Sequence, residues 1–190
     1  CALPIWQDLL AQVGDTTVLS AEQLNAAGLG SLTVFANQIQ MGDSITGDAP
    51  VLNLTAGGSM QMKAREGDVA LQGQVNAQGG RIEVLAQGGD VVLHTGSVLN
   101  AAGTQRDDRY DRGNITVGAA RGGEVSLKAS GSVVLQSDSE IDVSGAAWRQ
   151  LDGGLVKGAA GRVTLKANDG TAGAGATMPT GSVDLNGTLS

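Results

Sequence analysis

Large aromatic side chains are nearly absent from this chain of 190 residues, which contains two Trp, one Tyr and one Phe. Because globular cores usually draw much of their buried area from such rings, the interior here must be filled by Val, Leu, Ile and Ala. Glycine is abundant at 30 residues, but it follows no third-residue period and is joined by only three prolines, which excludes collagen. A hydrophobic fraction of 41% also argues against a wholly disordered chain.

Cysteine and histidine each occur once, as Cys1 and His94. An internal disulfide is therefore impossible, and a zinc site of thiolates and imidazoles cannot be assembled, so we expect no metal and no cofactor. His94 follows Leu93 and is expected to point outward, with nothing around it that indicates catalysis. The chain does not begin with Met and shows no signal peptide, so we expect a mature or excised piece. Cys1 is then either the acylated residue of a bacterial lipoprotein or an arbitrary chain boundary.

Long apolar runs and basic stripes are also missing from the sequence. No run approaches the ~20 residues that a membrane-spanning helix needs, so we expect that the chain does not span a membrane. The net charge is −7, and the 12 Lys and Arg residues are scattered along the sequence without forming a stripe. We therefore expect no binding to nucleic acid or to anionic membranes, and we interpret the acidity as a source of solubility.

The chain does contain a repeat, which begins at Met60 (MQMKAREGDVALQGQVNAQGG), at Ile82 (IEVLAQGGDVVLHTGSVLNAAG) and at Val125 (VSLKASGSVVLQSDSEIDVSGAA). The first two copies start 22 residues apart, and the next step of 43 is close to two such units. Its excess carries a polar insertion and a further short strand, predicted at 115–119. Weaker copies occur at 31–47 and from Val163 to the end of the chain.

Each copy divides into three short segments separated by turn residues. In the second copy the segments are 82–84, 91–93 and 98–100, and in the third copy they are 125–127, 133–135 and 141–143. Three strands in a unit of about 22 residues are typical of one coil of a parallel β-solenoid. We therefore expect an all-β fold over 31–190, in which coils stack at the ~4.8 Å strand spacing and enclose a common apolar column.

The expected core ladder of this column is made of inward-pointing aliphatic side chains, namely Ile82, Val84, Val91, Leu93, Val125, Leu127, Val133, Leu135, Ile141 and Val143. Gly88, Gly89, Gly96 and Gly131 are expected at the corners, where a positive φ or a close backbone approach is needed. Two other architectures are disfavoured, because a transmembrane barrel needs longer strands with aromatic girdles and a β-sandwich needs a bulkier core.

Asn76 and Asn100 fall near equivalent ends of their units, in VNAQGG and VLNAAG. They are interpreted either as part of an internal asparagine ladder at a corner or as outward-facing corner residues. The sequence leaves both interpretations open.

The first 30 residues differ from the repeat. Ile5, Leu9 and Val13 stand at helical spacing before Gly14, which predicts a helix over 4–14. Ser20 and Gln23 have the spacing of a capping box, which predicts a second short helix that ends at Gly28. Residues 1–30 are interpreted as a cap that covers the open edge of the first coil, or as two irregular coils of the same solenoid.

Three insertions interrupt the repeat, near 104–114, 146–158 and 168–181. Insertions in solenoids lie on the outside and often carry recognition, so the first two supply the candidate ligand-contact residues. These candidates combine charge with aromatic rings and are Arg106, Asp107, Asp108, Arg109, Tyr110, Asp111 and Trp148. The alternatives are a self-paired charged loop and a Trp148 that simply packs over a coil.

Three phrases carry a family resemblance: GDVVLHTGSVLNAAG (89–103), GSVVLQSDSEIDVSGAA (131–147) and GRVTLKAND (161–169). They resemble coils of the filamentous haemagglutinin-like exoproteins of bacterial two-partner secretion. The resemblance covers about 31–190 and implies a right-handed parallel β-helix within a long rod, located on the cell surface or secreted. It also implies export by an outer-membrane partner transporter, attachment to host cells, other bacteria or matrix, and in some relatives a toxin at the tip. The scarcity of cysteine fits export as an unfolded chain.

No secretion-domain motif is found, so the family resemblance predicts a shaft or accessory segment with a structural and adhesive role and no catalytic residue. One alternative is a β-helical polysaccharide lyase or glycosidase that uses Asp107, Asp108 and Asp111. Acid–base chemistry needs rigidly separated carboxylates, and the aligned outward positions show no stacked pair of acids, because they hold Gln61, Glu83, Ser126 and Val92. Another alternative is a subunit that polymerises through exposed strand edges.

Overall fold

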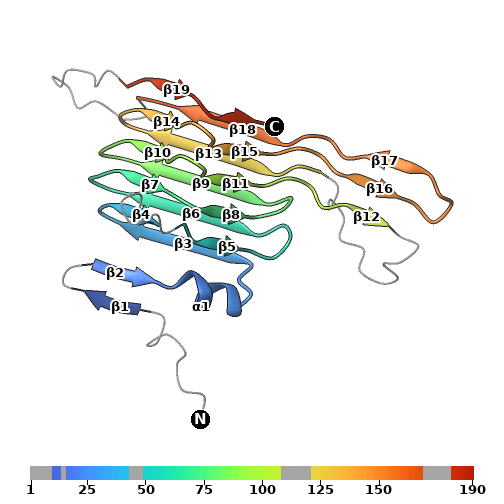
Figure 1. Ribbon diagram of the computed structural model, residues 1–190, viewed down its shortest axis with the longest axis horizontal. Helices are drawn as coiled ribbons and strands as arrows, with labels where there is room; N and C mark the ends of the chain where they lie inside the picture. Colours follow the sequence, from blue (N-terminus) through green and yellow to red (C-terminus); the bar gives the residue numbers. More distant parts are fainter. Residues whose placement is uncertain (1–9, 14–15, 43–48, 108–120, 169–180) are drawn as a thin grey trace, which may run out of the picture.

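The computed structural model of the protein describes residues 10–13, 16–42, 49–107, 121–168 and 181–190. Within these ranges the chain forms short β-strands and a single α-helix (Figure 1). Most strands belong to parallel sheets, which confirms the all-β parallel class predicted from the repeat.

Three five-stranded parallel sheets make up the body of the molecule. The first sheet contains β3 (Ser31–Ala36), β6 (Ser59–Ala64), β9 (Arg81–Ala86), β13 (Glu124–Ala129) and β18 (Arg162–Lys166). The second contains β4 (Ile39–Met41), β7 (Val69–Leu71), β10 (Val91–Leu93), β14 (Val133–Leu135) and β19 (Val183–Leu185). The third contains β5 (Val51–Asn53), β8 (Gln74–Asn76), β11 (Val98–Asn100), β15 (Glu140–Asp142) and β20 (Thr188–Leu189). Each repeat unit therefore gives one strand to each sheet, and the units follow one another in chain order from blue to red in Figure 1.

The starts of the repeat copies coincide in the first sheet. Met60 pairs with Ile82, Ile82 with Val125, and Val125 with Val163. Because β9 pairs directly with β13, the 43-residue step between their copies adds no further unit to the three sheets. The strand predicted at 115–119 lies outside the described residues.

All ten residues of the expected core ladder are buried. Nine are fully enclosed, and Val143 is 7% exposed. In the second sheet Val91 pairs with Val133 and Leu93 with Leu135, so identical or similar side chains stack in register. The apolar column is therefore continuous through the central units.

The strand register of the third sheet differs from the alignment of the predicted segments. The segment predicted at 98–100 coincides with β11, but the one predicted at 141–143 is one residue late, because β15 is Glu140–Asp142 and Leu99 pairs with Ile141. The physical reason is that buried serines, Ser97 and Ser139, directly precede β11 and β15 and interrupt the apolar pattern. The Ser97 hydroxyl donates to the Leu71 carbonyl oxygen at 2.7 Å and the Ser139 hydroxyl to the Gln136 carbonyl oxygen at 2.6 Å, so neither polar group is buried without a hydrogen bond.

A stack of glycines allows the units to approach closely at the corner before the first sheet. A Cβ atom on Gly80 would overlap the backbone of Gly58, one on Gly123 would overlap Gly80, and one on Gly161 would overlap Gly123. The predicted corner glycines Gly88, Gly89 and Gly131 are similarly crowded, and Gly96 has open space but a φ of 75°. Both reasons given for corner glycines therefore occur.

The N-terminal region contains a short helix and a two-stranded antiparallel sheet. Helix α1 (Ala21–Ala26) follows Ser20, whose hydroxyl accepts from the Gln23 amide at 3.4 Å, and the chain turns at Gly28 with a φ of 60°. The predicted short helix with Ser20 as its N-cap is thereby confirmed. The helix predicted over 4–14 is wrong for its described part, because β1 (Leu10–Val13) is a strand that pairs antiparallel with β2 (Thr16–Leu19). The β-branched run in β2 favours this pairing over the helical spacing. Residues 1–9, including Cys1, lie outside the described residues.

Helix α1 lies against the outer edge of the third sheet. The Asn25 side chain donates from Nδ2 to the Val51 carbonyl oxygen and accepts at Oδ1 from the Asn53 amide, both at 2.7 Å. Leu24, on the same helix, is buried at 8% exposure. A side-chain amide thus takes the hydrogen-bonding positions that a neighbouring strand would take at the edge of β5.

Candidate functional site

Two of the predicted insertions meet in a small side sheet, defined by β12 (Arg106–Asp107), β16 (Ala147–Arg149) and β17 (Leu155–Lys157). Strand β12 pairs parallel with β16, and β16 pairs antiparallel with β17. Figure 1 shows the side sheet beyond the ends of β11 and β15, away from the three stacked sheets. Segments about forty positions apart in the sequence therefore form one surface.

The side sheet forms because its segments leave the stack at the same corner. Strands β11 and β15 are neighbours, and the chain continues from both in parallel. The Ala101 amide donates to the Asp142 carbonyl oxygen and the Gly103 amide to the Ser144 carbonyl oxygen, both at 2.8 Å. The pairing of the third sheet is thus extended outward into β12 and β16.

The structure brings together three of the seven candidate ligand-contact residues. Arg106 pairs with Trp148 in the register of β12 and β16, and Asp107 pairs with Arg149. Asp108, Arg109, Tyr110 and Asp111 lie outside the described residues. No pattern in the sequence indicates that Arg106 and Asp107 would pair with the strand of Trp148, since that pairing depends on the register of the third sheet.

Asp107 and Arg149 form an ion pair across the side sheet. Arg149 Nε lies 3.9 Å from Asp107 Oδ2, and the two side chains are 46% and 29% exposed. A pair this open to solvent contributes little stability, roughly 0–1 kcal/mol. Asp107 therefore interacts with a residue of the other insertion, a contact that the prediction of a self-paired charged loop does not include.

The β16–β17 hairpin presents apolar side chains to solvent. Leu151 is 73% exposed, Leu155 58% and Val156 40%. Val156 pairs directly with Trp148, which is half-buried, and the turn closes at Gly153 with a φ of 86°. An exposed aliphatic surface with a half-buried Trp beside it is suited to contact with another molecule rather than to proton transfer.

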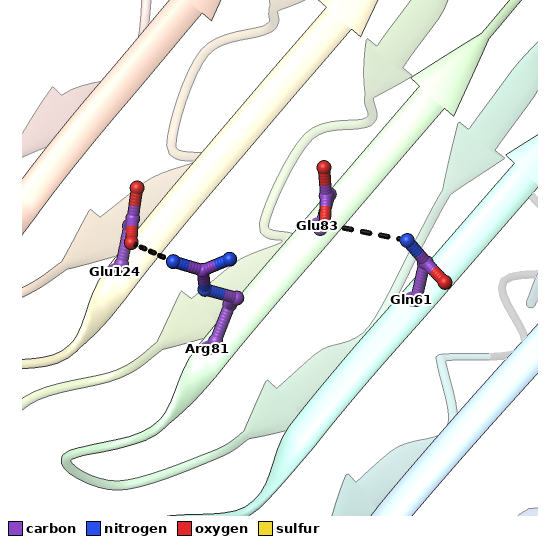
Figure 2. Close-up of polar contacts among 4 residues, drawn as sticks. All are labelled: Gln61, Arg81, Glu83 and Glu124. Atoms are coloured by element: carbon purple, nitrogen blue, oxygen red, sulfur yellow. Dashed lines mark hydrogen bonds and ion pairs between the residues drawn. The ribbon is translucent and has the colours of Figure 1, made fainter.

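Polar contacts also follow the outer face of the first sheet, meaning the side chains that alternate away from the apolar column. Figure 2 shows two of them: Gln61 Nε2 donates to Glu83 Oε2 at 3.3 Å, and Arg81 forms an ion pair with Glu124 at 2.6 Å. Gln61, Glu83 and Ser126 lie in one row across β6, β9 and β13. In these three strands that row contains one carboxylate, Glu83. On the second sheet the outward Val92 lies between Ala70 and Val134, so neither of these rows holds a stacked pair of acids in the strands named.

Asparagines line the outer side of the third sheet. Asn53, Asn76 and Asn100 share one register position, and Asp142 continues the row. Asn76 Nδ2 donates to Asn53 Oδ1 at 2.8 Å. Because the flanking Val75 and Ala77 are buried, Asn76 points outward, so the ladder runs along the surface and not inside the column.

A second side-chain ladder was missed by the sequence reasoning. Asp68 Oδ1 accepts from the Asp90 amide at 2.8 Å, Asp90 Oδ1 accepts from the Ser132 amide at 2.7 Å, and Ser132 Oγ accepts from the Ser182 amide at 3.1 Å. The signal was present as a recurring Gly-Asp/Ser-Val at the start of four of the five strands of the second sheet, at 67–69, 89–91, 131–133 and 181–183. These residues join successive units and are structural.

No protein-family model, curated protein or solved structure matches the chain. Among the residues that the structure describes, no group of three or more His, Cys, Asp or Glu side chains has the arrangement of a metal site. His94 is half-buried, and its backbone amide donates to the Leu71 carbonyl oxygen at 2.9 Å. Helix α1, with six residues, is too short to cross a membrane, and the described ranges hold no longer apolar helix.

Proposed function

We propose that this chain is a right-handed parallel β-helix and serves as a rod segment of a secreted or cell-surface bacterial exoprotein of the filamentous haemagglutinin type. Its role is structural and adhesive, in attachment or cell–cell contact. The family resemblance over 31–190 supports the biological setting, including export by an outer-membrane partner transporter.

One observation carries the architectural part of the proposal. The strand orders of the three parallel sheets are β18-β13-β9-β6-β3, β19-β14-β10-β7-β4 and β20-β15-β11-β8-β5, so every sheet takes its strands from successive units in the same sequence. A chain that passes through three sheets in turn and returns one strand further along describes a coil. Repetition of such coils extends a molecule in one direction, as a rod requires.

The side sheet supports the adhesive part of the proposal. It is the place where Trp148 and the exposed Leu151, Leu155 and Val156 come together, next to β12. Trp is among the residue types that contribute most to binding energy at protein interfaces, and the exposed leucines and valine add apolar contact area around it. Its position outside the stacked sheets leaves it accessible along the side of a rod.

Small-angle scattering of the purified protein tests the rod. Five units at the ~4.8 Å strand spacing stack to about 20–25 Å, so the rod is tested by adding units. Each further copy of 77–100 inserted after Asn100 is expected to lengthen the particle by about 5 Å at constant cross-section. Several added copies that leave the length of the particle unchanged would contradict the proposal. A crystal structure would determine the handedness, and a left-handed coil would contradict that part.

Attachment is tested with beads that carry the protein, applied to epithelial cells, bacteria and matrix-coated surfaces. The variant Trp148→Ala, Val156→Ser is expected to reduce bead retention, because it removes the paired apolar side chains of the side sheet. The matched control is Leu19→Ser, which removes an exposed apolar side chain of β2, 37% exposed, away from the side sheet. Equal retention of both variants would contradict adhesion through the side sheet, provided circular dichroism shows that both are folded.

A further inference from the structure

We propose that the outer face of the first sheet binds a linear acidic polysaccharide whose charges are uronate carboxylates. The inference rests on the proposed function and names the receptor class of the rod. The first observation that supports this proposal is the distribution of charged side chains over the faces of the three sheets. This distribution follows from the strand register and cannot be seen in the linear sequence.

The basic residues of the stacked sheets are confined to one face. The strands of the first sheet carry five Lys and Arg against two Glu, and all seven point outward: Lys63, Arg81, Glu83, Glu124, Lys128, Arg162 and Lys166. The strands of the second and third sheets carry Asp184, Glu140 and Asp142 and have no Lys or Arg. A chain with a net charge of −7 therefore presents a positively charged face, although its cations are scattered in sequence.

Three of these cations lie in one row, which we call the lysine row and which consists of Phe35, Lys63, Leu85, Lys128 and Lys166. With strands ~4.8 Å apart, Lys63 and Lys128 are separated by about 10 Å and Lys128 and Lys166 by about 5 Å. These separations are comparable with one disaccharide and one sugar of an extended polysaccharide. A linear polymer lying across the strands would meet a cation at such intervals.

Phe35 lies at the β3 end of the lysine row. It is the single Phe of the chain and is 64% exposed, although the chain has very few aromatic rings and an apolar interior close by. A ring placed on the surface beside lysines provides an apolar platform for the flat face of a sugar. The pairing of Phe35 with Lys63 aligns this platform with the cations.

A polar row runs beside the lysine row and consists of Thr33, Gln61, Glu83, Ser126 and Thr164. Ser126 is buried at 7% exposure, and the other members of the row, Thr33, Gln61, Glu83 and Thr164, include both donors and acceptors, as the hydroxyl groups of a sugar require. Gln61 and Glu83 are already joined by a hydrogen bond of 3.3 Å, which holds the two side chains in place (Figure 2). The lysine row would bind the charges of the polymer and the polar row its hydroxyl groups.

The same face disfavours polymers of higher charge density. Glu83 and Glu124 lie among the cations, and Arg81 is already paired with Glu124 at 2.6 Å. A nucleic acid carries a phosphate at every residue and a heavily sulfated glycan several charges per disaccharide, so both would be repelled by these carboxylates and by the net charge of −7. A polymer with one carboxylate per sugar or per disaccharide matches the sparse cations better.

Calorimetric titration of the intact protein with a short hyaluronan oligosaccharide tests the proposal, at low salt and at physiological ionic strength. The variant Lys63→Gln, Lys128→Gln is expected to weaken binding roughly tenfold by removing two ionic contacts. Phe35→Ala is expected to weaken it by about threefold and to leave the salt dependence unchanged. Lys157→Gln, on β17 of the side sheet, is the matched control and should bind like the wild type.

Parallel titrations use a heparin fragment, a single-stranded DNA oligomer and a neutral dextran fragment. The proposal is overturned by absence of hyaluronan binding, by equal weakening in the Lys157→Gln control, or by tighter binding of heparin or DNA, which would indicate unspecific attraction of polyanions. A failure here leaves the lengthening of the particle by added units intact. A failure of the proposed function appears as a particle whose length added units do not change, whether or not the oligosaccharide binds.

Discussion

Side chains at the same register position are buried to different extents at the two ends of the stack. Leu52 in the first unit and Leu189 in the last occupy one register row of the third sheet, yet Leu52 is 3% exposed and Leu189 46%. Ile39 and Val183 form the corresponding pair in the second sheet, at 7% and 40%. The repeat alone therefore does not bury an inward side chain, because burial depends on what lies on both sides of the unit.

Helix α1 accounts for part of the difference. It covers the β5 edge with Leu24 and uses Asn25 to satisfy the backbone of Val51 and Asn53. At the other end β18, β19 and β20 are outermost in their sheets, and Leu185 is 50% exposed. One end is covered by a different kind of element, and the other presents parallel strand edges and apolar side chains that suit a further unit of the same repeat.

The largest expected loss of unfolding free energy comes from a substitution in the glycine stack, which lies between the two ends. Gly123→Ala places a Cβ against the backbone of Gly80, which cannot move without displacing its own unit, so we expect a loss of roughly 3 kcal/mol or more of unfolding free energy. Chemical denaturation measures it. Gly154→Ala, where the nearest atoms belong to the flexible Asp152 and Gln150 side chains, is the control and should cost less than about 1 kcal/mol. Similar losses in both variants would mean that the corner is not crowded.

The comparison of the ends is tested directly by Leu52→Ala and Leu189→Ala. Truncation of the buried Leu52 is expected to cost about 3 kcal/mol, and truncation of the half-exposed Leu189 less than about 1 kcal/mol. The chemistry of the two substitutions is the same, so the difference reports the surroundings. Equal losses of unfolding free energy would show that the last unit is covered in solution, for example by a second copy.

The open end is tested by extending it. A copy of residues 77–103 appended after Ser190 is expected to raise the melting temperature, because it covers Val183, Leu185 and Leu189 and pairs with three strand edges. The gain is expected to be about 2 kcal/mol, after the cost of ordering the added residues. A control copy with Asp at its inward Val and Leu positions should give no gain. A gain from the control as well would exclude apolar stacking as the cause.

The smallest expected effect concerns Asn25. Asn25→Ala leaves the Val51 carbonyl and the Asn53 amide without their partner, which is expected to cost about 1 kcal/mol. Hydrogen exchange of the Asn53 amide is the sensitive measurement and should become faster. Gln23→Ala, an exposed change on the same helix, is expected to leave that exchange rate unchanged. An Asn53 amide that stays protected in Asn25→Ala would show that the edge of β5 has another cover.

Much of the stack could be predicted from sequence, because its strands alternate and its copies begin at matching residues. Met60, Ile82, Val125 and Val163 were aligned correctly by this pattern alone. The one-residue error in the segment predicted at 141–143 arose where the buried Ser139 interrupts the apolar pattern. The strand Leu10–Val13 was missed because its pairing with β2 outweighs a helical spacing of only a few residues.

The functional surfaces were less accessible to prediction. The side sheet depends on two insertions that meet only because β11 and β15 are neighbours. The basic face depends on outward residues of five strands, so cations such as Lys63 and Lys128, distant in sequence, become near neighbours only once the register is known. Local patterns determine strands, whereas surface composition depends on the alignment of all units.

The corner beyond β11 and β15 determines where the sequence of such a chain can change in evolution. Both described excursions leave and re-enter there, and the strands on either side keep their partners despite steps of 22 and 43 residues between copies. Residues can therefore be gained or lost at this corner without altering which side chains face one another across the sheets. New surface can be acquired there while the interior is inherited unchanged.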